Sequence, residues 1–261
     1  MAGELLIDRP LDGVLRLSIS NPTKRNALDH CLLDAIAAAL DDLDGVRCVV
    51  LTGCDGMFSS GYDIGAIPAD LFAVEAEKLV AHPFSSALDA LDAAEVPTIA
   101  ALCGPTIGGG LELALGCDLR IAAANIDLGM PPAKLGLIYS HTGMRRFLNA
   151  IGEPRTRELF LLGRYIDAPT AHDWGLVNWV VPNAELEAAS LELAARLAAN
   201  APLAISGNKR VLRELLRAEA AVDADVEREL LALRESSFAS HDLREGVTAF
   251  AEKRLPRWKG R

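Results

Sequence analysis

The sequence predicts an α/β core followed by a helical C-terminal region. Across most of the first 200 residues, short apolar runs typical of strands alternate with segments of helical periodicity. Only helical patterns follow in residues 201–261. Glycine-rich corners come directly after two of the buried strands, as expected where a strand leads into a helix. We therefore expect a core with the ligand site at 1–200 and a helical region at 201–261 that packs on another surface.

The elements of the core are expected in this order. A strand at Gly13–Ser20 alternates and ends in a turn, and Asp29 has the position of an N-cap for a helix to about Leu43. Continuous apolar runs predict buried strands. The remaining expected elements are a strand at 46–53, a helical region at 70–94, a strand at 98–104, a short helix holding Glu112, and strands at 118–124 and 176–182.

The C-terminal part is expected to be helical. Two long helices are predicted at Leu186–Ala199 and Pro202–Ser236, and a final one at Asp242–Lys253. Before them, a proline pair at 131–132 excludes a continuous helix, and helical patterns beyond Gly143 end at glycines.

Composition narrows the class of protein. With 51% hydrophobic and 24% charged residues the chain is typical of globular proteins, and its net charge of −10 argues against nucleic-acid binding. The five cysteines include no C-x-x-C pair, which favours thiols in a reducing compartment. The N-terminal residues lack a signal-peptide pattern and no apolar run suits a membrane span, so we expect a cytoplasmic protein.

Two glycine corners share one order of buried strand, glycine loop and helix start: "VVLTGCDGMFSSGYDI" and "TIAALCGPTIGGGLEL". Glycine leaves backbone N–H groups accessible, and the first N–H groups of a helix are unpaired. Two such corners can each supply one N–H to an oxygen that becomes negative during a reaction. The loops lack the P-loop, the dinucleotide-binding and the G-x-S-x-G patterns, and the histidines form no metal-ligand cluster.

Glu112 is the acid within "GGGLELALG", and its neighbours predict burial on all sides. A surface acid in a first helical turn is the simpler interpretation. A buried carboxylate has a raised pKa, as a general acid or base requires.

Together these residues resemble the crotonase (enoyl-CoA hydratase/isomerase) superfamily nearly from end to end. The resemblance rests on "NPTKRNALD", "FSSGYDI", "GPTIGGGLELALGCDLRIA" and the closing "GVTAFAEKRLPRWKG". It implies a spiral of ββα units, C-terminal helices that form a homotrimer or a hexamer of two trimers, and an acyl-CoA substrate without a further cofactor or metal. It also implies an enolate intermediate stabilised by the backbone N–H groups of Tyr62 and Gly109.

The resemblance further assigns the nucleotide end of coenzyme A to basic segments. "NPTKRNA" offers Lys24, Arg25 and Ala27 where relatives line the nucleotide site, and the tail offers Lys253 for the phosphates. A solvated basic tail is the alternative for the second segment.

One departure from the family pattern concerns the chemistry. Hydratases of the family hold water between two glutamates; Glu112 matches the first, whereas "MPPAKLG" places Pro132 where the second is expected. Nearby candidates to replace it are Lys134, Tyr139, Ser140 and His141, and we expect Tyr139 and His141 to act in catalysis. A one-acid isomerase and a hydratase with another group remain open.

The run "PAKLGLIYSHTG" also resembles methylmalonyl-CoA decarboxylase-type members, which have a tyrosine in this position beside a glutamate. There Tyr139 would orient the departing carboxylate or supply a proton. Tyr62 is a departure from those members, which have histidine. The prediction is therefore a hydratase/isomerase-type enzyme, with a decarboxylase and a catalytically weak acyl-CoA-binding protein as alternatives.

Overall fold

The structure is a computed structural model that describes residues 2–63, 80–219 and 223–260. Its centre is a six-stranded sheet in the order β1-β2-β3-β4-β6-β9. These strands are β1 (Glu4–Leu11), β2 (Val14–Ser20), β3 (Cys48–Gly53), β4 (Thr98–Leu102), β6 (Leu119–Ala123) and β9 (Trp179–Val181). Neighbours are parallel except β1 and β2, which form an antiparallel hairpin. The predicted buried strands β3 and β4 are confirmed at the middle of this sheet.

A second, smaller sheet lies beside the first. It pairs β5 (Thr106–Ile107), β7 (Asp127–Gly129) and β8 (Tyr165–Asp167) in the order β5-β7-β8. The sequence does not predict these strands, because two or three residues are too short to show a periodicity. The mixed α/β architecture that was predicted is confirmed.

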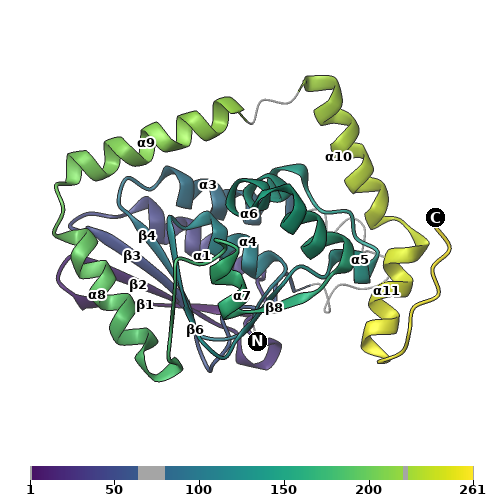
Figure 1. Ribbon diagram of the computed structural model, residues 1–261, viewed down its shortest axis with the longest axis horizontal. Helices are drawn as coiled ribbons and strands as arrows, with labels where there is room; N and C mark the ends of the chain where they lie inside the picture. The colour runs from purple at the N-terminus through teal and green to yellow at the C-terminus, as the bar shows by residue number, and fades with distance from the viewer. Residues whose placement is uncertain (1, 64–79, 220–222, 261) are drawn as a thin grey trace.

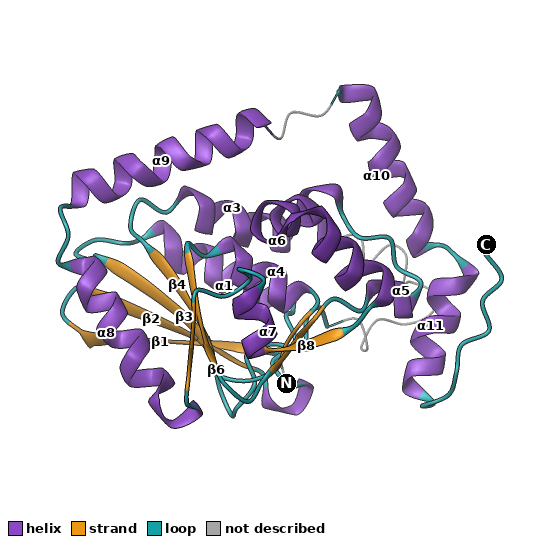
Figure 2. Cartoon of the chain, in the orientation of Figure 1, coloured by secondary structure: helices purple, strands orange, loops and turns teal. Residues whose placement is uncertain are grey.

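Helices surround both sheets (Figure 1, Figure 2). Those of the core are α1 (His30–Asp41), α3 (Ser85–Ala93), α4 (Gly109–Gly116), α5 (Pro132–Leu135), α6 (His141–Leu162), α7 (Ala168–Asp173) and α8 (Leu186–Ala198), with short turns η1 (Pro22–Lys24), η2 (Val80–Phe84) and η3 (Asn183–Glu185). Helix α8 packs across the six-stranded sheet, and α1 packs on α3. The Asp29 cap is confirmed, since its carboxylate accepts the Leu32 N–H at 3.0 Å. Of the helical region predicted at 70–94, residues 70–79 lie outside the described residues.

The C-terminal region consists of α9 (Pro202–Glu219), α10 (Ala224–Phe238) and α11 (His241–Ala251). A single helix over Pro202–Ser236 was therefore a wrong prediction. Helix α9 runs along one side of the molecule, and α10 turns down another side toward α11 (Figure 1). Asp223 starts α10 as an N-cap by accepting the Asp225 N–H at 2.9 Å. The sequence has no glycine or proline at this break, so the helix-forming pattern of the sequence continues from α9 into α10.

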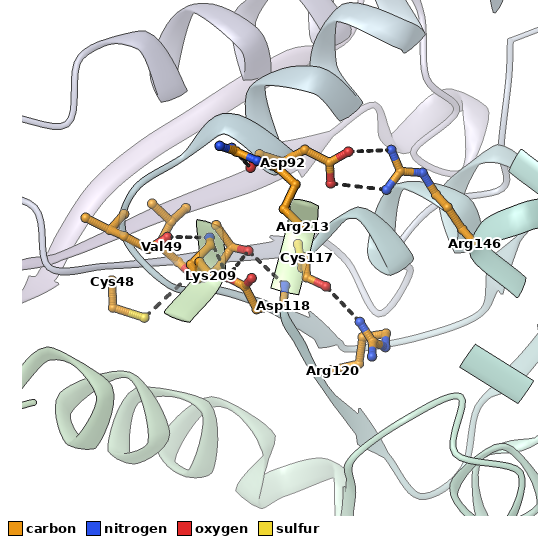
Figure 3. A network of polar contacts seen from close by, with 11 residues as sticks. Cys48, Val49, Asp92, Cys117, Asp118, Arg120, Arg146, Lys209 and Arg213 are labelled. Carbon is orange, nitrogen blue, oxygen red and sulfur yellow. Dashed lines mark hydrogen bonds and ion pairs between the residues drawn. The ribbon is translucent and has the colours of Figure 1, made fainter. Parts of the chain in front are cut away.

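Long charged side chains fasten α9 to the core (Figure 3). The Lys209 ammonium donates to Asp118 Oδ2 and to the Val96 carbonyl, each at 2.7 Å. One turn further, Arg213 donates to the Asp92 carbonyl at 2.8 Å. Polar contacts therefore account for this attachment, while apolar side chains of α9 stay exposed, among them Leu203, Val211, Leu212, Leu215 and Leu216. Within the described part of the chain, no helix is both long and apolar enough to cross a membrane.

Candidate functional site

Backbone hydrogen bonds join the two glycine corners. Ile107 N–H donates to the Ser59 carbonyl at 2.9 Å, and Ser59 and Thr106 form a parallel bridge. The same ladder continues outward on both sides: Leu28 N–H donates to Gly61 O at 2.8 Å, and Gly108 N–H donates to Gly129 O at 2.9 Å. The loop that follows β3 is thus held alongside β5, which follows β4 and belongs to the small sheet.

The glycines of "IGGG" have separate reasons to be glycine. Gly108 lies at φ 57° and ψ −125°, a conformation that L side chains rarely adopt. At Gly109 a Cβ would lie 2.7 Å from Cε1 of the Tyr62 ring, closer than van der Waals contact allows. The Tyr62 ring therefore packs directly on the backbone of residue 109.

Tyr62 and Gly109 line one pocket. Its walls are mostly apolar and come from both corners, from α5 and from the C-terminal helices; they include Ser60, Gly61, Ile107, Pro131, Pro132, Leu135, Leu137, Tyr139, Phe238 and Leu243. Gly109 begins α4, where the first N–H groups have no intrahelical partner. Within the described ranges the Tyr62 and Gly109 N–H groups have no acceptor in the protein, so both can donate to a ligand.

Glu112 lies behind this pocket and is reached through a tyrosine. Its side chain is buried, with only 2% of the residue exposed. Tyr139 lines the pocket, and its hydroxyl donates to Glu112 Oε2 at 2.5 Å. The Tyr62 hydroxyl lies 3.4 Å from that of Tyr139. The surface interpretation of Glu112 is therefore wrong, and the structure forms a chain of three groups from the pocket to the carboxylate.

Burial determines the protonation states of Glu112, Tyr139 and Tyr62. It raises the pKa of Glu112, against the Tyr139 hydrogen bond and the charges of Arg146 and Arg234, which lower it. The pKa values of Tyr139 and Tyr62 are raised well above the ordinary tyrosine value, first by burial and then by the charge of Glu112. Both phenols therefore stay protonated at neutral pH, and Glu112 holds a proton more readily than a solvated carboxylate.

A charged pair behind α4 positions one of these cations. Arg146 of α6 makes a two-pronged ion pair with Asp92 of α3, at 2.9 and 3.2 Å (Figure 3). The pair fixes a guanidinium whose field acts on Glu112. The carboxylate is thus balanced between burial, which favours the neutral acid, and nearby positive charge, which favours the anion.

The other candidates around Tyr139 have separate positions. Pro132 is buried at the start of α5 and lines the pocket, so the position where the family's second glutamate is expected does face the site. The Ser140 hydroxyl caps α6 by accepting the Gly143 N–H at 3.0 Å. Lys134 extends over the Tyr165 ring, with its nitrogen 5.5 Å from the ring centre. His141 lies at the start of α6 with Nε2 3.7 Å from Glu227 Oε1, and lines a different cavity below α9.

The residues expected to bind coenzyme A lie in two places. Lys24 ends η1 and pairs with Asp63 at 2.5 Å, while Arg25 adopts a left-handed conformation directly after it. Ala27 is buried, with its N–H bonded to Lys24 O at 3.1 Å. Lys253 is exposed just beyond α11, and its N–H donates to Phe250 O at 3.2 Å. The partner Asp63 was not anticipated, and it offsets the charge that Lys24 offers to a phosphate.

Comparison with known proteins identifies the family. The model of the family described as Enoyl-CoA hydratase/isomerase matches residues 10–261. The chain belongs to this family. It is similar to the putative enoyl-CoA hydratase/isomerase YngF of Bacillus subtilis (34% identity, 94% of each chain) and to 2,3-dehydroadipyl-CoA hydratase of Escherichia coli (33% identity, 99% of each).

Solved structures of the enoyl-CoA hydratase/isomerase family share its fold. A methylmalonyl-CoA decarboxylase in complex with 2-nitronate-propionyl-CoA superposes with a TM-score of 0.89 at 29% identity, covering 98% of each chain. An enoyl-CoA hydratase from Mycobacterium avium subsp. paratuberculosis superposes with a TM-score of 0.83 at 27% identity, again over 98% of each. The predicted crotonase-type fold is thereby confirmed.

Two residues of the pocket wall could not be predicted from the sequence. Phe238 of α10 and Leu243 of α11 belong to the region expected to serve oligomerisation, yet they complete the pocket wall. Apolar residues in helices carry no local sign of which cavity they face. The sequence marks Tyr62 as a departure from the decarboxylase-type pattern, but it does not indicate that its ring packs on Gly109.

The raised pKa of Glu112 predicts how stability depends on pH. A carboxyl whose pKa is raised on folding contributes fully below its unfolded pKa, and that contribution is lost as pH rises through the folded value. As pH rises from about 4.5 toward 8, the native protein loses this contribution, whereas the Glu112→Gln variant has none to lose. We therefore expect the Tm of the variant to rise relative to that of the native protein, by roughly 2–4 °C for each kcal/mol of stability lost. Thermal melts across this range measure it, with Glu235→Gln on exposed α10 as the control. If the difference in Tm between the variant and the native protein were the same at every pH, burial would not be raising the pKa of Glu112.

Proposed function

We propose that the protein decarboxylates a short acyl-CoA thioester that carries a carboxylate on C2, of the methylmalonyl type. The observation that carries this proposal is the Tyr139 hydroxyl, which lines the pocket and donates to buried Glu112 at 2.5 Å. The likeness to methylmalonyl-CoA decarboxylase supports it. Lys24, Arg25, Ala27 and Lys253 are proposed to hold the nucleotide end of coenzyme A.

In this reaction the thioester oxygen accepts the N–H groups of Tyr62 and Gly109. The bond between C2 and the carboxylate breaks, CO2 leaves, and the electron pair forms an enolate whose charge rests on that oxygen. For the next step Glu112 is protonated and donates to the Tyr139 hydroxyl, the reverse of the hydrogen bond described above, which frees the Tyr139 proton for C2. Tyr139 gives that proton to C2, takes the Glu112 proton, and Glu112 regains one from solvent, so that each CO2 released consumes one proton. The raised pKa of Glu112 suits this role, because a protonated carboxyl is the required donor.

The wall opposite the N–H groups also favours loss of CO2 over addition of water. Pro131, Pro132, Leu135 and Leu137 occupy the side where a second carboxylate would hold water. An apolar wall offers neither a second base nor a hydrogen-bond partner that could hold a water molecule for addition. A reaction that needs no water is therefore favoured at this site.

A second candidate is hydration or isomerisation of an enoyl-CoA. The similarity to hydratases over nearly the whole chain favours it, as does the retained Glu112. In that case Glu112 and Tyr139 would share the water or proton that two glutamates handle in hydratases. His141 has no part in either mechanism, because its imidazole lies in the other cavity.

Turnover of two thioesters separates these functions. We expect purified protein to release CO2 from methylmalonyl-CoA, and the Tyr139→Phe variant to lose about 10²–10⁴-fold in rate, as is typical for loss of a general acid. Tyr165→Phe, on the partly exposed strand β8, is the matched control and should keep full activity. Loss of the enone absorbance of crotonyl-CoA without CO2 release would show the hydratase instead, and tight binding with neither signal would show a binding protein.

The role of the Gly109 N–H has its own test. In Gly109→Ala the new Cβ must displace the Tyr62 ring, since it would lie 2.7 Å from Cε1. We expect a loss of about 10²–10³ in kcat/KM on the preferred thioester, which is the usual effect of losing an oxyanion donor. Gly207→Ala, in α9 with no atom within 4 Å of the new methyl, is the control. Activity within threefold of the native value would exclude residue 109 from this role.

We also propose a homotrimer, or a hexamer of two trimers, formed through the C-terminal helices. Val211, Leu212, Leu215 and Leu216 lie on one stretch of α9 and are 47–61% exposed, which is unusual for side chains that serve no interface. Light scattering should give the mass of a trimer or a hexamer of the 27.8 kDa chain. The double variant Leu212→Glu/Leu215→Glu should be monomeric while Arg210→Glu stays assembled. A native monomer would refute the proposal.

A further inference from the structure

The described residues that line the pocket include three with a side-chain hydroxyl, and two of these hydroxyls already donate to a protein acceptor. Ser60 Oγ donates to the Lys24 carbonyl at 3.2 Å, and Tyr139 donates to Glu112 Oε2 at 2.5 Å. The third belongs to Tyr62, whose oxygen lies 3.4 Å from that of Tyr139. This distance is well beyond the ordinary length of a bond between two hydroxyls, so the Tyr62 proton is available for a better acceptor.

The Tyr62 ring is held rigidly in the pocket wall. One face lies on the backbone of Gly109, where a Cβ would come within 2.7–3.0 Å of three ring atoms. Phe84 meets the ring edge to face, with centroids 4.8 Å apart. The backbone on both sides of Tyr62 is also paired, because Leu28 N–H donates to Gly61 O and Asp63 N–H donates to Leu28 O. A hydroxyl on such a ring has a fixed position relative to the Tyr62 N–H.

This arrangement ties one residue to two parts of the same substrate. The backbone N–H of Tyr62 is placed to bind the thioester oxygen, and its side chain reaches the Tyr139 hydroxyl, where the proposed proton donor acts. The group that lies near both on a methylmalonyl-type thioester is the carboxylate on C2. A phenol that stays protonated donates to a carboxylate and does not repel it.

We propose that the Tyr62 hydroxyl binds the carboxylate of the substrate and holds it out of the plane of the thioester, so that its bond to C2 breaks into the enolate. Tyr62 is thus a catalytic residue through its side chain as well as its backbone, and it selects thioesters with a C2 carboxylate. The inference rests on the proposed decarboxylation. No proton transfer is assigned to Tyr62; that step belongs to Tyr139.

Two reactions of the same active site separate this role from the others. Release of CO2 from methylmalonyl-CoA needs the carboxylate to be held. Exchange of the C2 hydrogens of propionyl-CoA with D2O needs the enolate oxygen site and Tyr139, but involves no carboxylate. We expect Tyr62→Phe to lower kcat/KM for CO2 release about 10- to 100-fold, as for a lost hydrogen bond to a charged group. The exchange rate should stay within threefold.

The controls give each outcome a meaning. Tyr139→Phe should lower both rates, and Tyr165→Phe should change neither. Equal loss of both rates in Tyr62→Phe would overturn the inference and make the ring a support for the backbone donors. Unchanged CO2 release in Tyr62→Phe would overturn the inference alone. Exchange without any CO2 release by the native protein would overturn the proposed decarboxylation, and the role of the hydroxyl with it.

Discussion

The site depends on one set of backbone contacts, the parallel pairing of the loop at Ser59 with the loop at Thr106. Each loop leaves a different strand of the six-stranded sheet, β3 in one case and β4 in the other, and neither could hold its glycines in place alone. Pairing satisfies backbone groups of both loops and holds the Ser59 loop beside β5, which itself pairs with β7. Among the described residues, the N–H groups of Tyr62 and Gly109 have no protein acceptor, and both residues line the pocket next to this pairing. These are the two N–H groups that we propose bind the thioester oxygen.

The buried carboxylate is the second constraint, and it follows from the first. Because Gly109 starts α4, Glu112 falls one turn later, on the side of the helix that faces the core. A carboxylate there needs a donor, and Tyr139 supplies it from the segment between α5 and α6. The Arg146–Asp92 pair adds positive charge close by without contacting the pocket. Glu112 and Tyr139 are therefore joined by a hydrogen bond between two buried side chains.

Much of this could be predicted from the sequence, and the rest depends on tertiary contacts. The strands β3 and β4, the Asp29 cap and the burial of Glu112 were visible because each has a local pattern of apolar residues or a capping side chain. The short strands of the small sheet have no such pattern. The break between α9 and α10 was missed because helix-forming residues continue across it. The contact between the Tyr62 ring and Gly109 joins residues 47 positions apart, and no spacing rule indicates it.

The C-terminal helices contribute to the pocket and also carry exposed apolar side chains. Phe238 and Leu243 close the pocket, while α9, which leads to them, is attached mainly by Lys209 and Arg213 and leaves apolar side chains exposed. A helix attached in this way moves at a lower energetic cost than one buried in the core. If another copy of the protein covered the apolar residues of α9, helices α10 and α11 would be held in place. The part of the pocket wall that Phe238 and Leu243 form would then be held in place too. An apolar wall that is complete only in the assembly would keep water from the enolate, and an enolate shielded from water takes its proton from Tyr139. For the proposed decarboxylation, one carboxylate behind one tyrosine would then be sufficient, whereas hydration would have to bring water into a pocket lined by proline and leucine.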